Sequence, residues 1–428
     1  KKEVGSVSGP EKCTRAGLKK KGARAKYFCA IEAYNQIVLL HLIYKKRVKE
    51  NRAFALDIKE RVKDKLCKHV TKIQRMPTEL SSLPVIDVSA LLNSNSNDNE
   101  QQEVALQIHQ ACRQWGFFYV QNHGVPLELQ EKLLDLSRRF FSQSEETKMQ
   151  ISMSKGGRAW RGYFPVGNEL TSGKPDGKEG LYFGTEIEDV NHSKVRDRIP
   201  LHGRNQFPSV NDDSIEFRQV ILSYMNAIEH LGRVIMSGLA RSLKLDTNFF
   251  DKNYFRDEPT CLFRIFNYPA AFCQQKGNEN LWGVGEHTDY GMLTILLQDD
   301  IGGLQVKTSQ GEWIQAPPIS NTFVCNIGDM LDRMTAGYYR STPHRVKNLS
   351  TTVDRLSFPF FLDPHWDAEV LPIPLDGVTT ISDDAEQRWD KASVHTFQGT
   401  YGDYLLKKVS KVFPDLAQEQ IVIGPNSY

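Results

Sequence analysis

Residues 283–298 read GVGEHTDYGMLTILLQ, in which a histidine and an aspartate stand one residue apart in front of an apolar run. Side chains at positions i and i+2 of a strand point to the same face, so His287 and Asp289 can offer an imidazole and a carboxylate to one metal ion. The same spacing occurs in ordinary polar turns that lead into buried strands. A third ligand is needed to decide between these two interpretations.

A second histidine, His344, stands at the start of a short apolar segment, 55 positions after Asp289. Two histidines and one carboxylate form the ligand set of non-haem iron(II) oxygenases and leave coordination positions open for substrates and oxygen. The other nearby histidine, His365, lies in the stretch DPHWD, and we interpret it as a turn or surface residue. We therefore predict His287, Asp289 and His344 as the metal ligands and catalytic residues.

Arg355 and Ser357 share one face of the next apolar segment, RLSFPFF. A buried arginine needs a matching charge, and its planar guanidinium suits a carboxylate held by two parallel hydrogen bonds, to which a serine hydroxyl adds a third. The alternative is that Arg355 pairs with an aspartate or glutamate of the protein itself.

In chain order, the HxD pair, the second histidine and the RxS pair resemble the iron(II)/2-oxoglutarate-dependent dioxygenases, and most closely their isopenicillin N synthase-like branch. The resemblance covers roughly residues 83–410. Further segments follow the family's order: PVIDVSAL, CRQWGFFYVQNHGVP, IFNYP, FVCNIGDML and RLSFPFFLDP.

The resemblance implies a mainly β fold with flanking helices, in which a double-stranded β-helix, or jelly roll, holds the metal at its open end. It implies Fe(II) as the metal and 2-oxoglutarate as a co-substrate bound by Arg355, Ser357 and Tyr268, the tyrosine of IFNYP. With O2, such an enzyme converts 2-oxoglutarate to succinate and CO2 while it oxidises, most commonly hydroxylates, a small organic metabolite.

Two alternatives stay open. Some oxidases of the same family hold iron but use no 2-oxoglutarate, and they retain an arginine-serine pair for a substrate carboxylate, so Arg355 and Ser357 do not exclude them. A non-enzymatic binding protein would normally show a broken ligand set, whereas the set in this chain is intact. The 2-oxoglutarate-dependent oxidoreductase is therefore the first hypothesis.

The spacing of apolar residues predicts helices near 101–115, 127–143 and 213–243, and from residue 260 onward short apolar runs separated by turns indicate a sandwich or barrel. The end of the chain resembles the family's closing helix, with four residues packed inward: Leu405, Leu406, Val409 and Val412. We divide the chain into a basic extension at 1–75, a helical region with loops at 76–255, a jelly-roll core at 256–370 and a C-terminal helical region at 371–428.

The region between residues 154 and 212 is rich in Gly, Pro, Asp and Asn, and loops of this length are uncommon unless they are functional. In the resembling enzymes this region comes near the mouth of the barrel. It holds four candidate substrate-binding residues: Arg158, Arg161, Tyr163 and Phe183. The alternatives are solvated loop charges for the arginines and packing under the loop for the aromatic residues.

The first 75 residues carry 21 Lys and Arg against 7 Asp and Glu, a net charge of +14, whereas the remainder carries 33 against 45, a net charge of −12. A targeting peptide or a nucleic-acid-binding arm could be basic in this way, but neither fits well. A transit peptide should be rich in Ser and Arg, whereas this segment is rich in Lys and holds only Ser6 and Ser8. The first methionine is Met76, just before globular patterning begins, so we expect 1–75 to be upstream sequence absent from the mature protein. No nucleic-acid partner is predicted.

The seven cysteines are scattered and form no CxxC pair, which argues against a disulfide framework and a zinc site. No stretch reaches the roughly 20 apolar residues of a transmembrane helix. We expect a cytoplasmic, monomeric enzyme that has no membrane partner and takes part in small-molecule metabolism.

Overall fold

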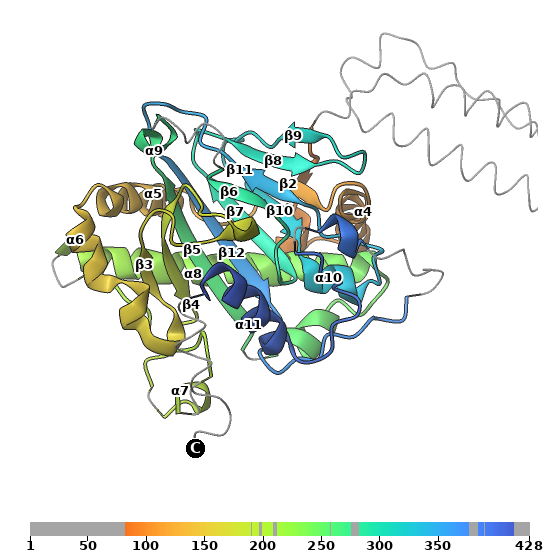
Figure 1. The fold of residues 1–428 in the computed structure, drawn as a ribbon. Coiled ribbons are helices and arrows are strands. Elements are labelled where there is room, and N and C mark those ends of the chain that lie inside the picture. Colours follow the sequence, from red (N-terminus) through yellow and green to blue (C-terminus); the bar gives the residue numbers. More distant parts are fainter. Residues whose placement is uncertain are drawn as a thin grey trace, which may run out of the picture. The chain divides into compact units, whose positions relative to one another are not determined.

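The computed structural model describes residues 82–189, 191–196, 199–208, 212–256, 258–274, 282–375, 384–388 and 390–414 (Figure 1). The predicted basic extension at 1–75 lies outside the described residues, and so do 376–383 and 415–428 of the predicted C-terminal region. Within the described ranges, no helix combines the length and the apolar character that crossing a bilayer requires.

Eight strands form the larger sheet, in the order β1-β2-β10-β7-β12-β5-β4-β3. Neighbouring strands are antiparallel except for β1 and β2, which are parallel. The strands are β1 (Val85–Asp87), β2 (Phe117–Gln121), β3 (Gly162–Phe164), β4 (Glu179–Gly184), β5 (Thr260–Tyr268), β7 (Leu293–Gln298), β10 (Phe323–Ile327) and β12 (Arg355–Asp363).

Four strands form the smaller sheet, in the order β6-β11-β8-β9, and all their pairs are antiparallel. They are β6 (Val284–His287), β8 (Leu304–Lys307), β9 (Trp313–Gln315) and β11 (His344–Val346). From β5 to β12 the chain alternates between the two sheets, since β6, β8 and β11 belong to one while β5, β7, β10 and β12 belong to the other, and β9 pairs with the preceding strand β8 within the smaller sheet. This alternation is the pattern of a double-stranded β-helix.

Helices cover the larger sheet on its outer side. The long helix α8 (Asp212–Ser242) packs against β7 and β12, and α4 (Asp98–Gln114) and α5 (Leu127–Phe141) pack against α8 in turn (Figure 1). Gly232 permits this close packing, because a Cβ added there would lie 2.8 Å from the side chain of Leu362. The predicted helices are thus present, with α4 starting at a capping box formed by Asn97 and Glu100.

The remaining helices are short, apart from the closing helix at the end of the chain. They are α3 (Ser89–Leu92), α6 (Glu145–Lys148), α7 (Ser193–Arg196), α9 (Ala270–Gln274), α10 (Asp329–Met334) and α11 (Tyr401–Val412). In α11, Leu405, Val409 and Val412 are buried as predicted, whereas Leu406 is only half-buried at the edge of the core.

The region predicted at 76–255 as helical with loops also supplies four strands, β1 to β4, to the larger sheet. All six residues of β4 are buried, so this strand has no polar face and no alternation of polar and apolar side chains. The three residues of β3 lie in a segment rich in glycine and proline. Neither β3 nor β4 could therefore be predicted from an alternation of polar and apolar residues.

Candidate metal centre

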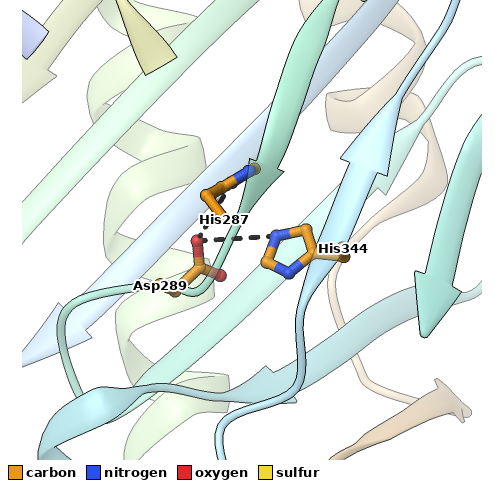
Figure 2. A group of neighbouring side chains, drawn as sticks. All are labelled: His287, Asp289 and His344. Carbon is orange, nitrogen blue, oxygen red and sulfur yellow. Dashed lines mark ion pairs between the residues drawn. The ribbon is translucent and has the colours of Figure 1, made fainter. Parts of the chain in front are cut away.

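The end of β6 and the start of β11 bring two histidines together. These strands pair directly, with His287 opposite His344, and their ring centroids lie 4.2 Å apart. Asp289 follows His287 by two residues and turns back toward both rings (Figure 2). Its Oδ1 lies 3.8 Å from Nε2 of His287 and 3.6 Å from Nε2 of His344.

Backbone carbonyls fix the orientation of both imidazoles. Nδ1 of His287 lies 2.8 Å from the carbonyl oxygen of Gly285, and Nδ1 of His344 lies 3.1 Å from that of Thr342. Because a carbonyl only accepts hydrogen bonds, each Nδ1 carries the proton and donates it. Each Nε2 therefore presents a lone pair toward the common centre, as a metal ligand requires.

The carboxylate of Asp289 is fixed by two donors from the larger sheet. Its Oδ2 accepts hydrogen bonds from Thr294 Oγ1 at 2.5 Å and Asn326 Nδ2 at 2.6 Å. Thr294 on β7 and Asn326 on β10 are cross-strand partners. Burial would raise the pKa of Asp289, but His344, His287 and these hydrogen bonds hold it below its ordinary value. Oδ1 stays free to bind a cation.

Among the described residues, His287, Asp289 and His344 form the one group of three or more His, Cys, Asp or Glu side chains arranged to hold a metal ion. Their ligand atoms all lie within 4.8 Å of one another. His365 is not part of the group and lies just beyond the end of β12. Two imidazoles and one carboxylate fit Fe(II).

Arg355, Ser357 and Tyr268 meet where β12 begins and β5 ends. Arg355 is paired across the strands with Tyr268, and its guanidinium carbon lies 4.9 Å from the centroid of that ring. The hydroxyls of Tyr268 and Ser357 are 3.4 Å apart. Because Ser357 follows Arg355 by two residues, both side chains face the same side of β12.

Arg355 is completely buried, yet its guanidinium is only partly satisfied. Nε donates to the carbonyl oxygen of Gly302 at 2.5 Å, and Nη2 donates to Gln298 Oε1 at 3.1 Å. Nη1 is buried with no hydrogen-bond partner, and no ion pair joins Arg355 to an Asp or Glu of the described chain. Burial raises the pKa of the Asp299 carboxyl and the charge of Arg355 partly lowers it again, but the two side chains form no ion pair. Nη1 is therefore left as a donor for a ligand.

One cavity joins the two groups. Its walls include the predicted triad together with Arg355, Ser357 and Tyr268. Apolar residues of α11 and the segment after it close one side: Leu405, Val409, Val412 and Phe413. The cavity thus brings metal-ligating side chains, a guanidinium with a free donor and an apolar wall together.

The four predicted substrate-binding residues do not line this cavity. Arg161 is buried and donates from Nη2 to the carbonyl oxygen of Leu201 at 2.6 Å, while Arg158 lines a separate surface pocket. The Tyr163 hydroxyl donates to Glu179 Oε2 at 2.6 Å, and Phe183 stacks on Phe207 and Phe263. The side chains of Arg161, Tyr163 and Phe183 are thus used in internal hydrogen bonds and packing.

Strand alternation explains why Phe183 does not line the cavity. Phe183 faces away from the cavity, whereas its neighbour Tyr182 lines it, because successive side chains of β4 point to opposite faces. The prediction did not include four acidic or basic residues of the cavity wall: Glu169, Lys178, Arg264 and Asp363. A signal for Arg264 was present, since it precedes Tyr268 by four residues on β5 and so shares its face.

Asp363 ends β12 and lies in the cavity wall. Burial raises its pKa from 3.8 to about 7. Between these two pH values the folded protein keeps a proton that the unfolded chain has lost. The free energy of unfolding therefore falls as the pH rises and levels off above about 7.

Replacing Asp363 with asparagine should remove this pH dependence. In denaturant titrations with a chelator, the wild type should lose about 2 to 3 kcal/mol more than the variant between pH 5 and pH 8; parallel pH profiles would contradict the assignment.

Two family profiles match the chain. Residues 83–210 match the non-haem dioxygenase in morphine synthesis N-terminal family, and residues 259–364 match the 2OG-Fe(II) oxygenase superfamily. A probable iron/ascorbate oxidoreductase of Dictyostelium discoideum is 46% identical, over 81% of this chain and 98% of that protein. A 1-aminocyclopropane-1-carboxylate oxidase of Dictyostelium mucoroides is 40% identical, over 79% of this chain and 97% of that protein.

Solved structures agree with the sequence matches. A full-length Neurospora crassa protein, crystallised in complex with alpha-KG and 5-formyluracil, superimposes with a TM-score of 0.62 at 27% identity, and the match covers 80% of this chain and 98% of that one. The predicted jelly roll with flanking helices is confirmed.

Proposed function

The chain belongs to the 2OG-Fe(II) oxygenase superfamily, and from this we propose that His287, Asp289 and His344 hold Fe(II). We further propose that Arg355, Ser357 and Tyr268 hold 2-oxoglutarate. The protein is an oxidoreductase of the 2-oxoglutarate-dependent dioxygenase type that oxidises a small organic molecule. Bound Fe(II) with 2-oxoglutarate supplies the activation of O2, and 2-oxoglutarate leaves as succinate and CO2.

The proposal that Arg355 binds 2-oxoglutarate depends mainly on its buried Nη1 atom, which has no hydrogen-bond partner in the described residues. A carboxylate placed beside it would receive two parallel hydrogen bonds from a guanidinium that Gly302 and Gln298 already hold in place. The hydroxyls of Ser357 and Tyr268 lie on the same side and can donate to the same ligand. Burial of the whole group excludes water and strengthens these contacts.

The residues around the iron site position it rather than exchange protons with the substrate. Thr294 and Asn326 hold the Asp289 carboxylate, and backbone carbonyls hold the imidazoles. No side chain of the protein needs to act as a general acid or base. The most common outcome, hydroxylation, then depends on where the cavity holds the substrate.

A direct experiment tests this function. Purified protein is mixed without oxygen with Fe(II) and 2-oxoglutarate, the weak visible absorption of their chelate is recorded, and succinate is assayed after oxygen is admitted. We expect the absorption band and, with a suitable substrate, succinate in proportion to product. Absence of iron binding would contradict the proposal.

A second candidate is an iron-dependent oxidase that uses no 2-oxoglutarate. It is supported by the 40% identity to a protein named 1-aminocyclopropane-1-carboxylate oxidase. In that case Arg355 and Ser357 would bind a substrate carboxylate. The same experiment distinguishes the two, because the oxidase would consume oxygen without forming the 2-oxoglutarate band or succinate.

We also propose that the protein works in small-molecule metabolism in a reducing compartment such as the cytoplasm. Cys112, Cys261 and Cys325 are buried free thiols, and burial raises the pKa of all three. Thiols kept neutral in this way are unreactive and suit such a compartment. Fluorescence microscopy of the tagged native protein tests the location.

A further inference from the structure

Arg264 lies in the middle of β5 and faces the cavity. It shares this face with Leu262, Phe266 and Tyr268, which also line the cavity. The β-ladder between β5 and β12 has no pair at Arg264, which lies opposite Pro359, a residue with no N–H to donate. Arg264 therefore presents a positive charge from a central strand into the cavity that contains the metal centre.

The flat face of the Arg264 guanidinium packs against aromatic rings, whereas the N–H groups at its edge form no hydrogen bond within the described residues. Its central carbon lies 3.5 Å from the centroid of the Tyr182 ring and 5.5 Å from that of Phe361. Within the part of the chain that the structure describes, no hydrogen bond or ion pair engages its N–H groups. Stacking fixes the plane of the guanidinium and leaves its edge donors available to a ligand.

The acidic groups near Arg264 are occupied by other partners. Glu169 forms an ion pair with Lys178 at 2.8 Å and accepts a hydrogen bond from the Tyr182 hydroxyl at 2.6 Å. Asp363 accepts hydrogen bonds from the Tyr401 hydroxyl and from the backbone N–H of Met292. The charge of Arg264 acts on the pKa of both carboxyl groups, but neither group lies within ion-pair distance of its guanidinium.

Arg264 is separate from the proposed 2-oxoglutarate site. Tyr268 stands four residues further along β5 and pairs with Arg355. At about 3.3 Å per residue, the two arginines are roughly 13 Å apart along the strands. Two anions can therefore occupy the cavity together, one bound to each arginine.

We propose that Arg264 binds a carboxylate of the molecule that the enzyme oxidises, so that its substrates are small organic acids. The inference rests on the proposed function, since it assumes that Arg355 is engaged by 2-oxoglutarate. The apolar part of such an acid would lie against Leu405, Val409 and Val412 of α11, which line the same cavity. The guanidinium edge meets the carboxylate through two parallel hydrogen bonds.

The test uses pairs of probes that differ only in charge. Hexanoate is compared with hexanamide, and 3-phenylpropanoate with 3-phenylpropanamide, by calorimetric titration of oxygen-free protein saturated with Fe(II) and 2-oxoglutarate. Wild type should bind at least one acid more tightly than its amide by roughly 10- to 100-fold. Arg264→Gln should abolish this preference, and Arg264→Lys should retain part of it.

The control is Arg218→Gln, which removes an exposed arginine on α8 that also lies over an aromatic ring, Phe207. It should leave the preference for the acid unchanged. Binding of 2-oxoglutarate, measured separately in every variant, should equal that of wild type and shows that each variant is folded.

Equal binding of acid and amide by wild type, no binding of either acid, or an unchanged preference in Arg264→Gln would overturn the inference. Failure of wild type to bind 2-oxoglutarate is a different result, and it would contradict the proposed function.

Discussion

Replacing Asp289 with alanine is expected to abolish iron-dependent turnover. Asp289 is the one anionic group in the triad, and Oδ1 is its free ligand atom, 3.8 Å and 3.6 Å from the two imidazole Nε2 atoms. The change also leaves Thr294 and Asn326 without their acceptor inside the protein. Fe(II) affinity should fall by more than the roughly 10- to 100-fold that loss of a supporting contact costs at a metal site.

Oxygen-free titration with Fe(II), followed by the succinate assay, measures both effects. His287→Ala and His344→Ala should behave in the same way, since each removes one of only three ligands. His365→Ala is the matched control, because it deletes a histidine outside the triad and should leave iron affinity unchanged. Retained turnover in any one of the three triad variants would remove that residue from the ligand set.

The metal centre was predictable because its geometry follows from local spacing and chain order. His287 and Asp289 are two residues apart at the end of a strand, and so are Arg355 and Ser357 at the start of another. The structure places all four, with His344 and Tyr268, around one cavity. What the sequence could not show is that β6 and β11 pair with His287 opposite His344, because cross-strand register depends on contacts between distant segments.

The substrate end of the cavity was not predictable in the same way. The polar groups there belong to segments far apart in the chain, such as Lys178 beside Glu169 and Arg264 over Tyr182. Phe183 is one residue away from Tyr182, which lines the cavity, and a shift of one residue reverses the face of a strand. Arginines in a loop of unknown shape, such as Arg158 and Arg161, gave no indication of whether they face a ligand or the protein interior.

Replacing Arg355 with alanine is expected to weaken 2-oxoglutarate binding by about 2 to 5 kcal/mol, roughly 30-fold to several-thousand-fold. The expectation rests on the buried Nη1 donor, which has no partner in the described protein, and on the full burial of the Arg355 side chain. The ligand's far carboxylate would then be buried without its counter-charge. Titration of 2-oxoglutarate into oxygen-free protein with Fe(II), followed through the visible chelate band, measures the loss.

General damage to the core has to be separated from loss of the carboxylate contact. Arg333→Ala is the matched control, because Arg333 is also a buried arginine but donates to the backbone carbonyls of Val370, Val394 and His395, away from the cavity. It should lower the unfolding temperature while sparing 2-oxoglutarate affinity. Arg355→Lys should recover part of the affinity, since an ammonium group restores the charge but cannot form the two parallel hydrogen bonds. If Arg355→Ala bound 2-oxoglutarate as tightly as wild type, other residues would have to hold the co-substrate, and the assignment of Arg355 as its carboxylate partner would be wrong.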